Sequence, residues 1–81
     1  MDFLFHTILE YNHVMVYYSI HKKDNCYFAE ILDNPSGVKE AKEFDLEMVN
    51  GEWKCSETLA ERQIMILGEE IEAWEEKRTA I

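Results

Sequence analysis

The dipeptide Asn50-Gly51 constrains the fold of this chain more than any other short segment. Asn and Gly tolerate the positive φ angles of a type I′ turn, which joins two antiparallel strands through only two residues. Pairing outward from this turn, with Val49 opposite Glu52, gathers apolar side chains on one face and charged ones on the other. The apolar face of this predicted hairpin holds Phe44, Leu46, Met48, Trp53 and Cys55.

Three earlier runs, at 3–9, 14–20 and 26–32, are rich in β-branched and aromatic residues and have the length of strands. We expect them to form two more hairpins, with tips at Tyr11-Asn12 and Lys23-Asp24. The two predicted registers agree on one inner face, and a slip by one residue would reverse it. On the first two strands this face holds Phe3, Phe5, Leu9, Val14, Val16, Tyr18 and Ile20.

The hydrophobic period becomes helical from Thr58 onward. Thr58 and Glu61 have the spacing of a capping box, which predicts the start of an amphipathic helix. The expected apolar stripe recurs at steps of three and four: Ala60, Ile64, Leu67, Ile71 and Trp74. Gly68 inside this helix costs about 1 kcal/mol relative to alanine, and it indicates either close packing on the sheet or a weak point.

A length of 81 residues gives room for a single small domain, at 1–81. The predicted fold is a two-layer α+β domain, in which a five-stranded antiparallel meander has the C-terminal amphipathic helix packed on one face. A strongly curled, barrel-like sheet is the alternative. The breaker cluster at 33–37 predicts a loop, and the segment 38–43 suits either a helical turn or the approach to the fourth strand.

The chain is acidic: 17 Asp and Glu against 8 Lys and Arg give a formal net charge of −9. Such a charge disfavours nonspecific attraction to phosphate backbones and anionic lipids, so we expect no direct nucleic acid binding and no membrane association. No segment approaches the roughly 20 apolar residues of a membrane span, and the first residues lack a basic region before a long apolar stretch. We therefore expect a cytoplasmic protein.

The histidines and cysteines do not have the spacing of a metal site. In the predicted registers His6 and His21 lie about four positions apart, roughly 13 Å, so we expect no metal and no cofactor. Cys26 and Cys55 fall on opposite faces and should stay reduced. Cys26 and His21 are predicted to face each other across the second hairpin, but no third orienting group accompanies them. The sequence therefore favours a noncatalytic domain.

The outer face of the first three strands is more apolar than a solvated face should be. Contiguous exposed apolar patches larger than a few hundred Å² usually mark a contact with a protein or a ligand. The sequence thus predicts a noncatalytic interaction domain that self-associates, as a homodimer or larger homo-oligomer, or binds an unidentified protein partner. The residues of this predicted surface are Leu4, Ile8, Met15, Tyr17 and Phe28. A curled sheet, or the segment 38–42 folded over the face, would bury it instead.

Two other functions stay open from the sequence. One is a small-molecule-binding or enzymatic domain, with a pocket between helix and sheet or near His21 and Cys26. The other is an acidic inhibitor that mimics nucleic acid and binds a basic protein in a salt-dependent way.

Overall fold

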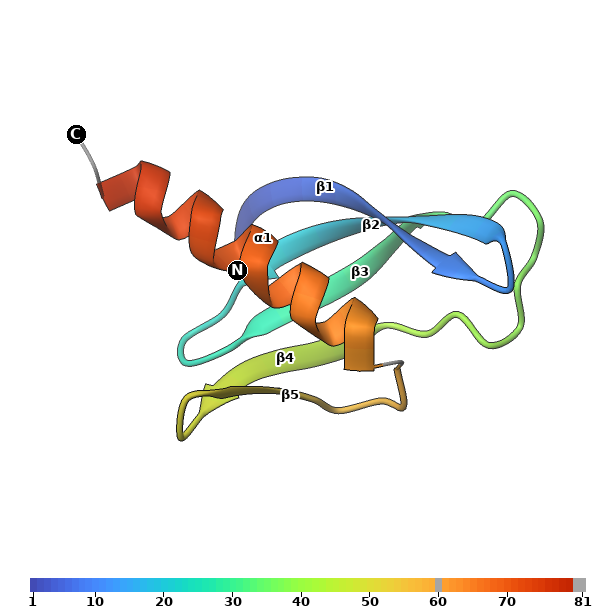
Figure 1. The fold of residues 1–81 in the computed structure, drawn as a ribbon. Coiled ribbons are helices and arrows are strands. Elements are labelled where there is room, and N and C mark those ends of the chain that lie inside the picture. The colour runs from blue at the N-terminus through green and yellow to red at the C-terminus, as the bar shows by residue number, and fades with distance from the viewer. Residues whose placement is uncertain (60, 80–81) are drawn as a thin grey trace.

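Five strands and one helix follow one another along the chain in the computed structural model, which describes residues 1–59 and 61–79, the side chains of 78 and 79 excepted (Figure 1). The elements are β1 (Asp2–Tyr11), β2 (Val14–Lys22), β3 (Tyr27–Asp33), β4 (Phe44–Val49), β5 (Glu52–Cys55) and α1 (Glu61–Thr79). The strands form one antiparallel sheet in the order β1-β2-β3-β4-β5. The sheet is curled, and α1 crosses one of its faces. The predicted α+β fold is confirmed.

The hairpin of β4 and β5 has the predicted register. Leu46 lies opposite Cys55, and Val49 lies opposite Glu52 on either side of the turn. Asn50 and Gly51 have φ angles of 51° and 81°, as a type I′ turn requires.

The tip of the first hairpin is Asn12-His13 and not the predicted Tyr11-Asn12. Tyr11 pairs with Val14, and the two residues between them have φ angles of 50° and 68°. Asn and His are both enriched at positive φ, so this segment also suits a two-residue turn. Moving the tip by one residue changes the partner of every residue by two positions, so that Leu9 lies opposite Val16 and not opposite Val14.

The second hairpin shows the same shift. Lys22 pairs with Tyr27, and the loop between them is closed by a 2.9 Å hydrogen bond from the Lys23 N–H to the Cys26 carbonyl. The predicted tip at Lys23-Asp24 is therefore wrong. Because side chains alternate with a period of two, a shift by two residues changes the partners but keeps each residue on its predicted face.

A bulge in β1 exchanges the places of Phe3 and Leu4. Phe3 lies opposite His21 and Phe5 lies opposite Ile20, so Leu4 is an extra residue with no opposite partner. An extra residue reverses the alternation of side chains beyond it. Leu4 is consequently buried in the core at 3% exposure, whereas Phe3 is 53% exposed. The predictions of an inner Phe3 and an outer Leu4 are both wrong.

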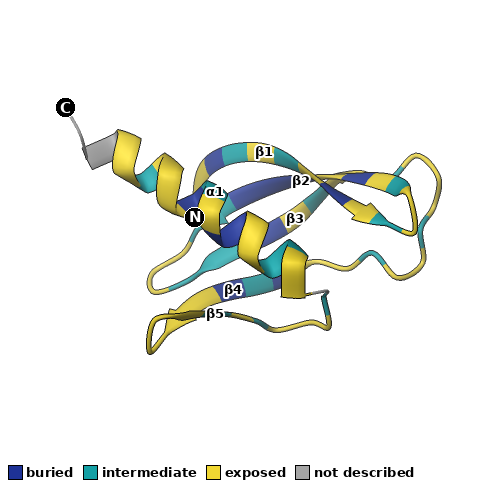
Figure 2. Cartoon of the chain, viewed as in Figure 1, coloured by how far each residue is buried: buried dark blue, intermediate teal, exposed yellow. Residues whose placement is uncertain are grey.

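The core lies between α1 and the sheet (Figure 2). Leu67 and Ile71 of the predicted helix stripe are fully buried, Ile64 is half-buried, and Trp74 is exposed at the far end. The helix begins at Glu61, so Thr58 precedes it, and Ala60 of the predicted stripe lies outside the described residues. The buried apolar side chains are Leu4, Leu9, Val16, Tyr18, Ile20, Ala29, Phe44, Leu46, Leu67 and Ile71.

Gly68 is a point of close contact between α1 and β5. A methyl group on Gly68 would lie 2.7 Å from Cγ of Trp53 and nearer still to Cδ1 and Nε1 of the same ring. The indole ring also packs on Tyr27, with ring centroids 5.8 Å apart. Of the two interpretations that the sequence left open, the structure therefore supports close packing.

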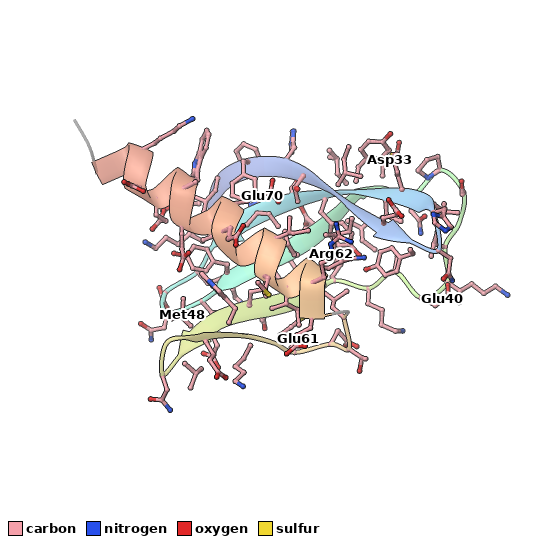
Figure 3. The ribbon with its side chains drawn as sticks, viewed as in Figure 1. Asp33, Glu40, Met48, Glu61, Arg62 and Glu70 are labelled. Atoms are coloured by element: carbon pink, nitrogen blue, oxygen red, sulfur yellow. The ribbon has the colours of Figure 1, made fainter. Side chains whose placement is uncertain are left out.

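Polar contacts fasten α1 to both ends of the first two strands. Glu70, labelled in Figure 3, accepts a 2.9 Å hydrogen bond from the Thr7 hydroxyl. Lys22 forms an ion pair with Glu75 at 2.7 Å. The Gln63 side-chain amide donates to the backbone carbonyl of Glu10, at the free edge of β1. The helix therefore covers part of this edge as well as the core.

The segment between β3 and β4 is irregular and packs against the core side of the sheet. The Asn34 side chain bonds both the N–H and the carbonyl of Val38 at 3.0 Å. Farther along, the Lys42 carbonyl accepts a 2.9 Å hydrogen bond from the Tyr18 hydroxyl, which also bonds the Tyr11 hydroxyl at 2.9 Å. Burial, followed by the bond to Tyr11, raises the pKa of Tyr18 far above its usual range. The segment is thus one ordered turn and loop, and not a further helix.

No helix within the described residues is both long enough and apolar enough to span a membrane.

Candidate interaction surface

Three predicted surface residues lie together on the outer face of the hairpin formed by β1 and β2. Ile8 lies directly opposite Tyr17, and Met15 is the next outward-facing residue of β2. Their exposed fractions are 51% for Ile8, 37% for Tyr17 and 52% for Met15. Neither α1 nor the loop before β4 covers them, so this part of the predicted surface is open to solvent.

Two further apolar side chains extend this surface, and sequence reasoning missed both. Ile66 of α1 is exposed and lines a depression of about 310 Å³ together with Ile8 and Arg62. Leu32 of β3 is exposed at a second bulge, between the residues opposite Tyr17 and Tyr18. Ile66 is an apolar residue outside the predicted apolar stripe of the helix. That position was the sequence signal that could have identified it as exposed. We call the set the hairpin patch: Ile8, Met15, Tyr17, Leu32 and Ile66.

The other predicted members do not belong to the patch. Leu4 is in the core because of the bulge in β1. Phe28 is only half-buried, but it lies farther along the sheet, opposite His21 and Asp45, with the Lys23 ammonium 5.3 Å from its ring centroid. It therefore contacts its own chain more than it faces solvent.

The middle of the outer face is covered from within the molecule. Ser19 is only 5% exposed, between its cross-strand neighbours His6 and Glu30. Phe3 lies beside this position, with its ring centroid 4.9 Å from that of His6 and 5.8 Å from that of His21. Ser19 and its neighbours thus separate two exposed apolar regions of this face: Ile8, Met15 and Tyr17 lie toward the tip of the hairpin, and Phe3, which is 53% exposed, lies on the other side.

The predicted opposition of His21 and Cys26 is wrong. His21 lies opposite Phe28, and its Nε2 is 3.3 Å from a carboxylate oxygen of Glu30 without satisfying the geometry of a hydrogen bond. Cys26 lies in the hairpin loop before β3. The shift of the register by two residues removes the cross-strand pair on which a thiolate–imidazole dyad depended.

The same shift brings two histidines closer than expected. His6 lies opposite Ser19, so His21 is only two positions away along β2, with the Phe3 ring in contact with both. Among the described residues, no group of three or more His, Cys, Asp or Glu side chains is placed to hold a metal ion.

Both cysteines are free thiols, and they line a common depression of about 250 Å³ on the outer side of β4 and β5. Burial raises the pKa of the Cys55 thiol, and a hydrogen bond from the Glu57 backbone only partly opposes this effect. A raised pKa leaves less of the nucleophilic thiolate at neutral pH.

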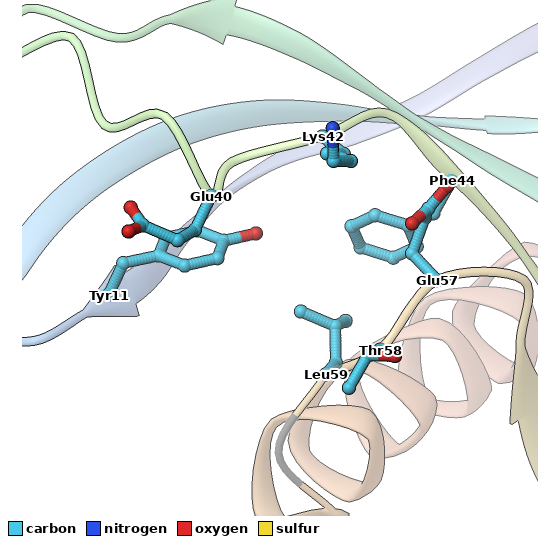
Figure 4. A pocket seen from close by; sticks show the side chains of 7 residues that line it. All are labelled: Tyr11, Glu40, Lys42, Phe44, Glu57, Thr58 and Leu59. Atoms are coloured by element: carbon cyan, nitrogen blue, oxygen red, sulfur yellow. The ribbon is translucent and has the colours of Figure 1, made fainter.

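A depression of about 280 Å³ opens between the end of β1, the loop before β4 and the segment before α1 (Figure 4). Its polar side chains are those of Tyr11, Glu40, Lys42, Glu57 and Thr58. In the part of the chain that the structure describes, these five side chains form no hydrogen bond or ion pair with one another. The site therefore shows no nucleophile held by a base, the arrangement that covalent catalysis requires.

No protein-family model matches the chain, and neither a curated protein nor a solved structure is significantly similar to it.

Proposed function

We propose that this chain is a noncatalytic protein-interaction domain that self-associates through the hairpin patch. The observation that carries the proposal is the cluster of Ile8, Met15 and Tyr17, which are neighbours in the strand register and remain exposed. Burying a large apolar side chain fully is worth about 1.5–3 kcal/mol, so burying the exposed half of each would contribute about 1 kcal/mol.

A second copy of the chain is the partner that suits this surface best. In a two-fold contact only the residues close to the axis lie beside their own counterparts, so charged groups there repel each other and apolar groups do not. The centre of the hairpin patch is apolar. The carboxylates of Glu10 and Asp33, which lie opposite Met15 and Tyr17, belong to its margin. The two copies can therefore meet at the centre without opposing like charges.

The test is the solution mass of the 81-residue chain, measured by light scattering over a hundredfold dilution series. We expect a concentration-dependent dimer or larger species. Tyr17→Glu and Ile8→Asp should each give a folded monomer, because a carboxylate at the contact would lose its hydration. Circular dichroism would verify that the variants are folded.

Met65→Lys is the matched control, because Met65 is an equally exposed apolar residue outside the hairpin patch. Its variant should associate like the original chain. A strict monomer at every concentration would refute self-association, and unchanged association of Tyr17→Glu and Ile8→Asp would show that another surface is used.

A further inference from the structure

The free edge of β5 faces a groove on the opposite side of the molecule from β1 in the strand order. In an antiparallel pair, alternate residues direct both backbone groups toward the partner strand or away from it. The two-residue turn makes Val49 and Glu52 a hydrogen-bonded pair. The 2.9 Å hydrogen bond from the Ser56 N–H to the Asp45 carbonyl fits this pattern, because Ser56 lies four residues after Glu52 and also directs its backbone toward β4. The backbone groups of Trp53, between these positions, therefore point away from β4.

Cys55 lies two residues after Trp53 in β5, so its backbone groups also point away from β4. Within residues 1–59 and 61–79, no hydrogen bond is made to the backbone N–H or carbonyl of either residue. Four backbone groups are thus available to an added strand. The other edge of the sheet differs, because Gln63 of α1 already bonds the Glu10 carbonyl there.

The groove beside this edge has the shape for an extended chain. It encloses about 570 Å³ between β5 and the first turns of α1. Trp53 and Ile64 are its half-buried apolar residues, and Met65 at its margin is 59% exposed. Successive side chains of an extended segment point to opposite sides. Every second side chain would therefore face these apolar groups.

The charges around the groove select the partner. Glu52 and Glu61 flank it, and its cation, Lys54, is already paired with Glu52 at 3.0 Å. The whole chain carries a formal net charge of −9. We infer that the β5 edge and this groove bind an extended segment of another protein in which basic residues alternate with apolar ones, by addition of a sixth strand. This contact is separate from the hairpin patch and does not depend on self-association.

The probe is an acetylated and amidated hexapeptide that alternates lysine with valine, titrated into the ¹⁵N-labelled full chain. We expect saturable shifts of the amide signals at 52–56 and 61–65. Its counterpart that alternates glutamate with valine should produce none, because it carries the same charge sign as the groove. No saturable shifts with the lysine peptide, or equal shifts with both, would overturn the inference.

Two peptides with methylated backbone nitrogens, at all lysines or at all valines, test for strand addition. Only one of the two sets of N–H groups faces β5 and can donate to the carbonyls of Trp53 and Cys55. One methylated peptide should therefore bind about 4- to 100-fold more weakly than the other, since each of two lost hydrogen bonds weakens binding roughly 2- to 10-fold. Equal affinity of the two methylated peptides would overturn strand addition.

Two matched variants separate this contact from the proposed self-association. Met65→Lys places a positive charge at the groove and should weaken the lysine peptide about tenfold, by charge repulsion and loss of apolar contact. Met15→Lys changes an equally exposed methionine in the hairpin patch. It should reduce self-association and leave peptide binding unchanged. If Met15→Lys weakened the peptide as much as Met65→Lys, the binding site would be the hairpin patch and the inference would be wrong.

Discussion

Replacing Gly68 with alanine tests the packing between α1 and β5, because two effects of opposite sign compete there. Alanine in the interior of a helix is favoured over glycine by about 1 kcal/mol. The new methyl group, however, would lie 2.7 Å from Cγ of Trp53, where carbon atoms normally approach to about 3.5–4.0 Å. The indole ring must therefore move by about 1 Å, against its contact with Tyr27.

Overpacking of this kind typically costs about 1–3 kcal/mol, and because two atoms of a rigid ring are even closer, we take the upper part of this range. After the gain in helix propensity, Gly68→Ala should destabilise the domain by about 1–2 kcal/mol. For a domain of this size, 1 kcal/mol corresponds to about 4–8 °C in Tm. We therefore expect Tm to fall by about 5–15 °C in thermal unfolding followed by circular dichroism.

Two controls isolate the overlap from helix propensity. Ala73→Gly, at an exposed position of the same helix, should cost about 1 kcal/mol by propensity alone. In a Trp53→Leu background the ring is absent, so Gly68→Ala should become stabilising by about 1 kcal/mol. A rise in Tm for Gly68→Ala in the original chain would refute the close packing on which the reasoning rests.

Two other predictions concern the core. Leu4→Ala should cost about 2–5 kcal/mol in chemical unfolding, whereas Phe3→Ala should stay within about 1 kcal/mol; the opposite order would contradict the bulge in β1. The raised pKa of Tyr18 means that its ionisation opposes folding, so its contribution to stability is complete below about pH 10 and is lost as the pH rises toward the folded pKa. Unfolding free energies at pH 9 and 11 should therefore differ less for Tyr18→Phe than for the original chain, and an equal difference would show that another group titrates.

The faces of the strands were predictable from the sequence, but two of the three hairpin registers were not. Alternation fixes whether a residue points inward, and a register shifted by two residues keeps that alternation. Only the turn decides between such registers. Asn50-Gly51 specifies its turn uniquely, so β4 and β5 paired as predicted. Asn12-His13 forms an equivalent turn without glycine, which gives a much weaker signal in the sequence.

The candidate surface was predicted only in part, because bulges and the position of the helix change exposure without leaving a periodic signal. One extra residue in β1 moved Leu4 into the core and Phe3 out of it. Ile66 became part of the surface because α1 lies beside β1, which only the three-dimensional structure reveals. Ile8, Met15 and Tyr17 follow the plain alternation of uninterrupted strand, and their exposure agrees with the prediction.

The acidity of the chain has opposite consequences for the two surfaces described above. Two copies that each carry a net charge of −9 repel each other, so added salt should strengthen contact through the hairpin patch by screening that repulsion. A basic segment at the β5 groove is attracted by Glu52 and Glu61, so the same salt should weaken its binding.

Both surfaces exist for the same structural reason. The curled sheet and α1 bury a shared core, and they leave uncovered the tip of the β1 and β2 hairpin and the last edge of the sheet. Because the signs of the two salt effects differ, dependence on ionic strength identifies which of these uncovered regions a given contact uses.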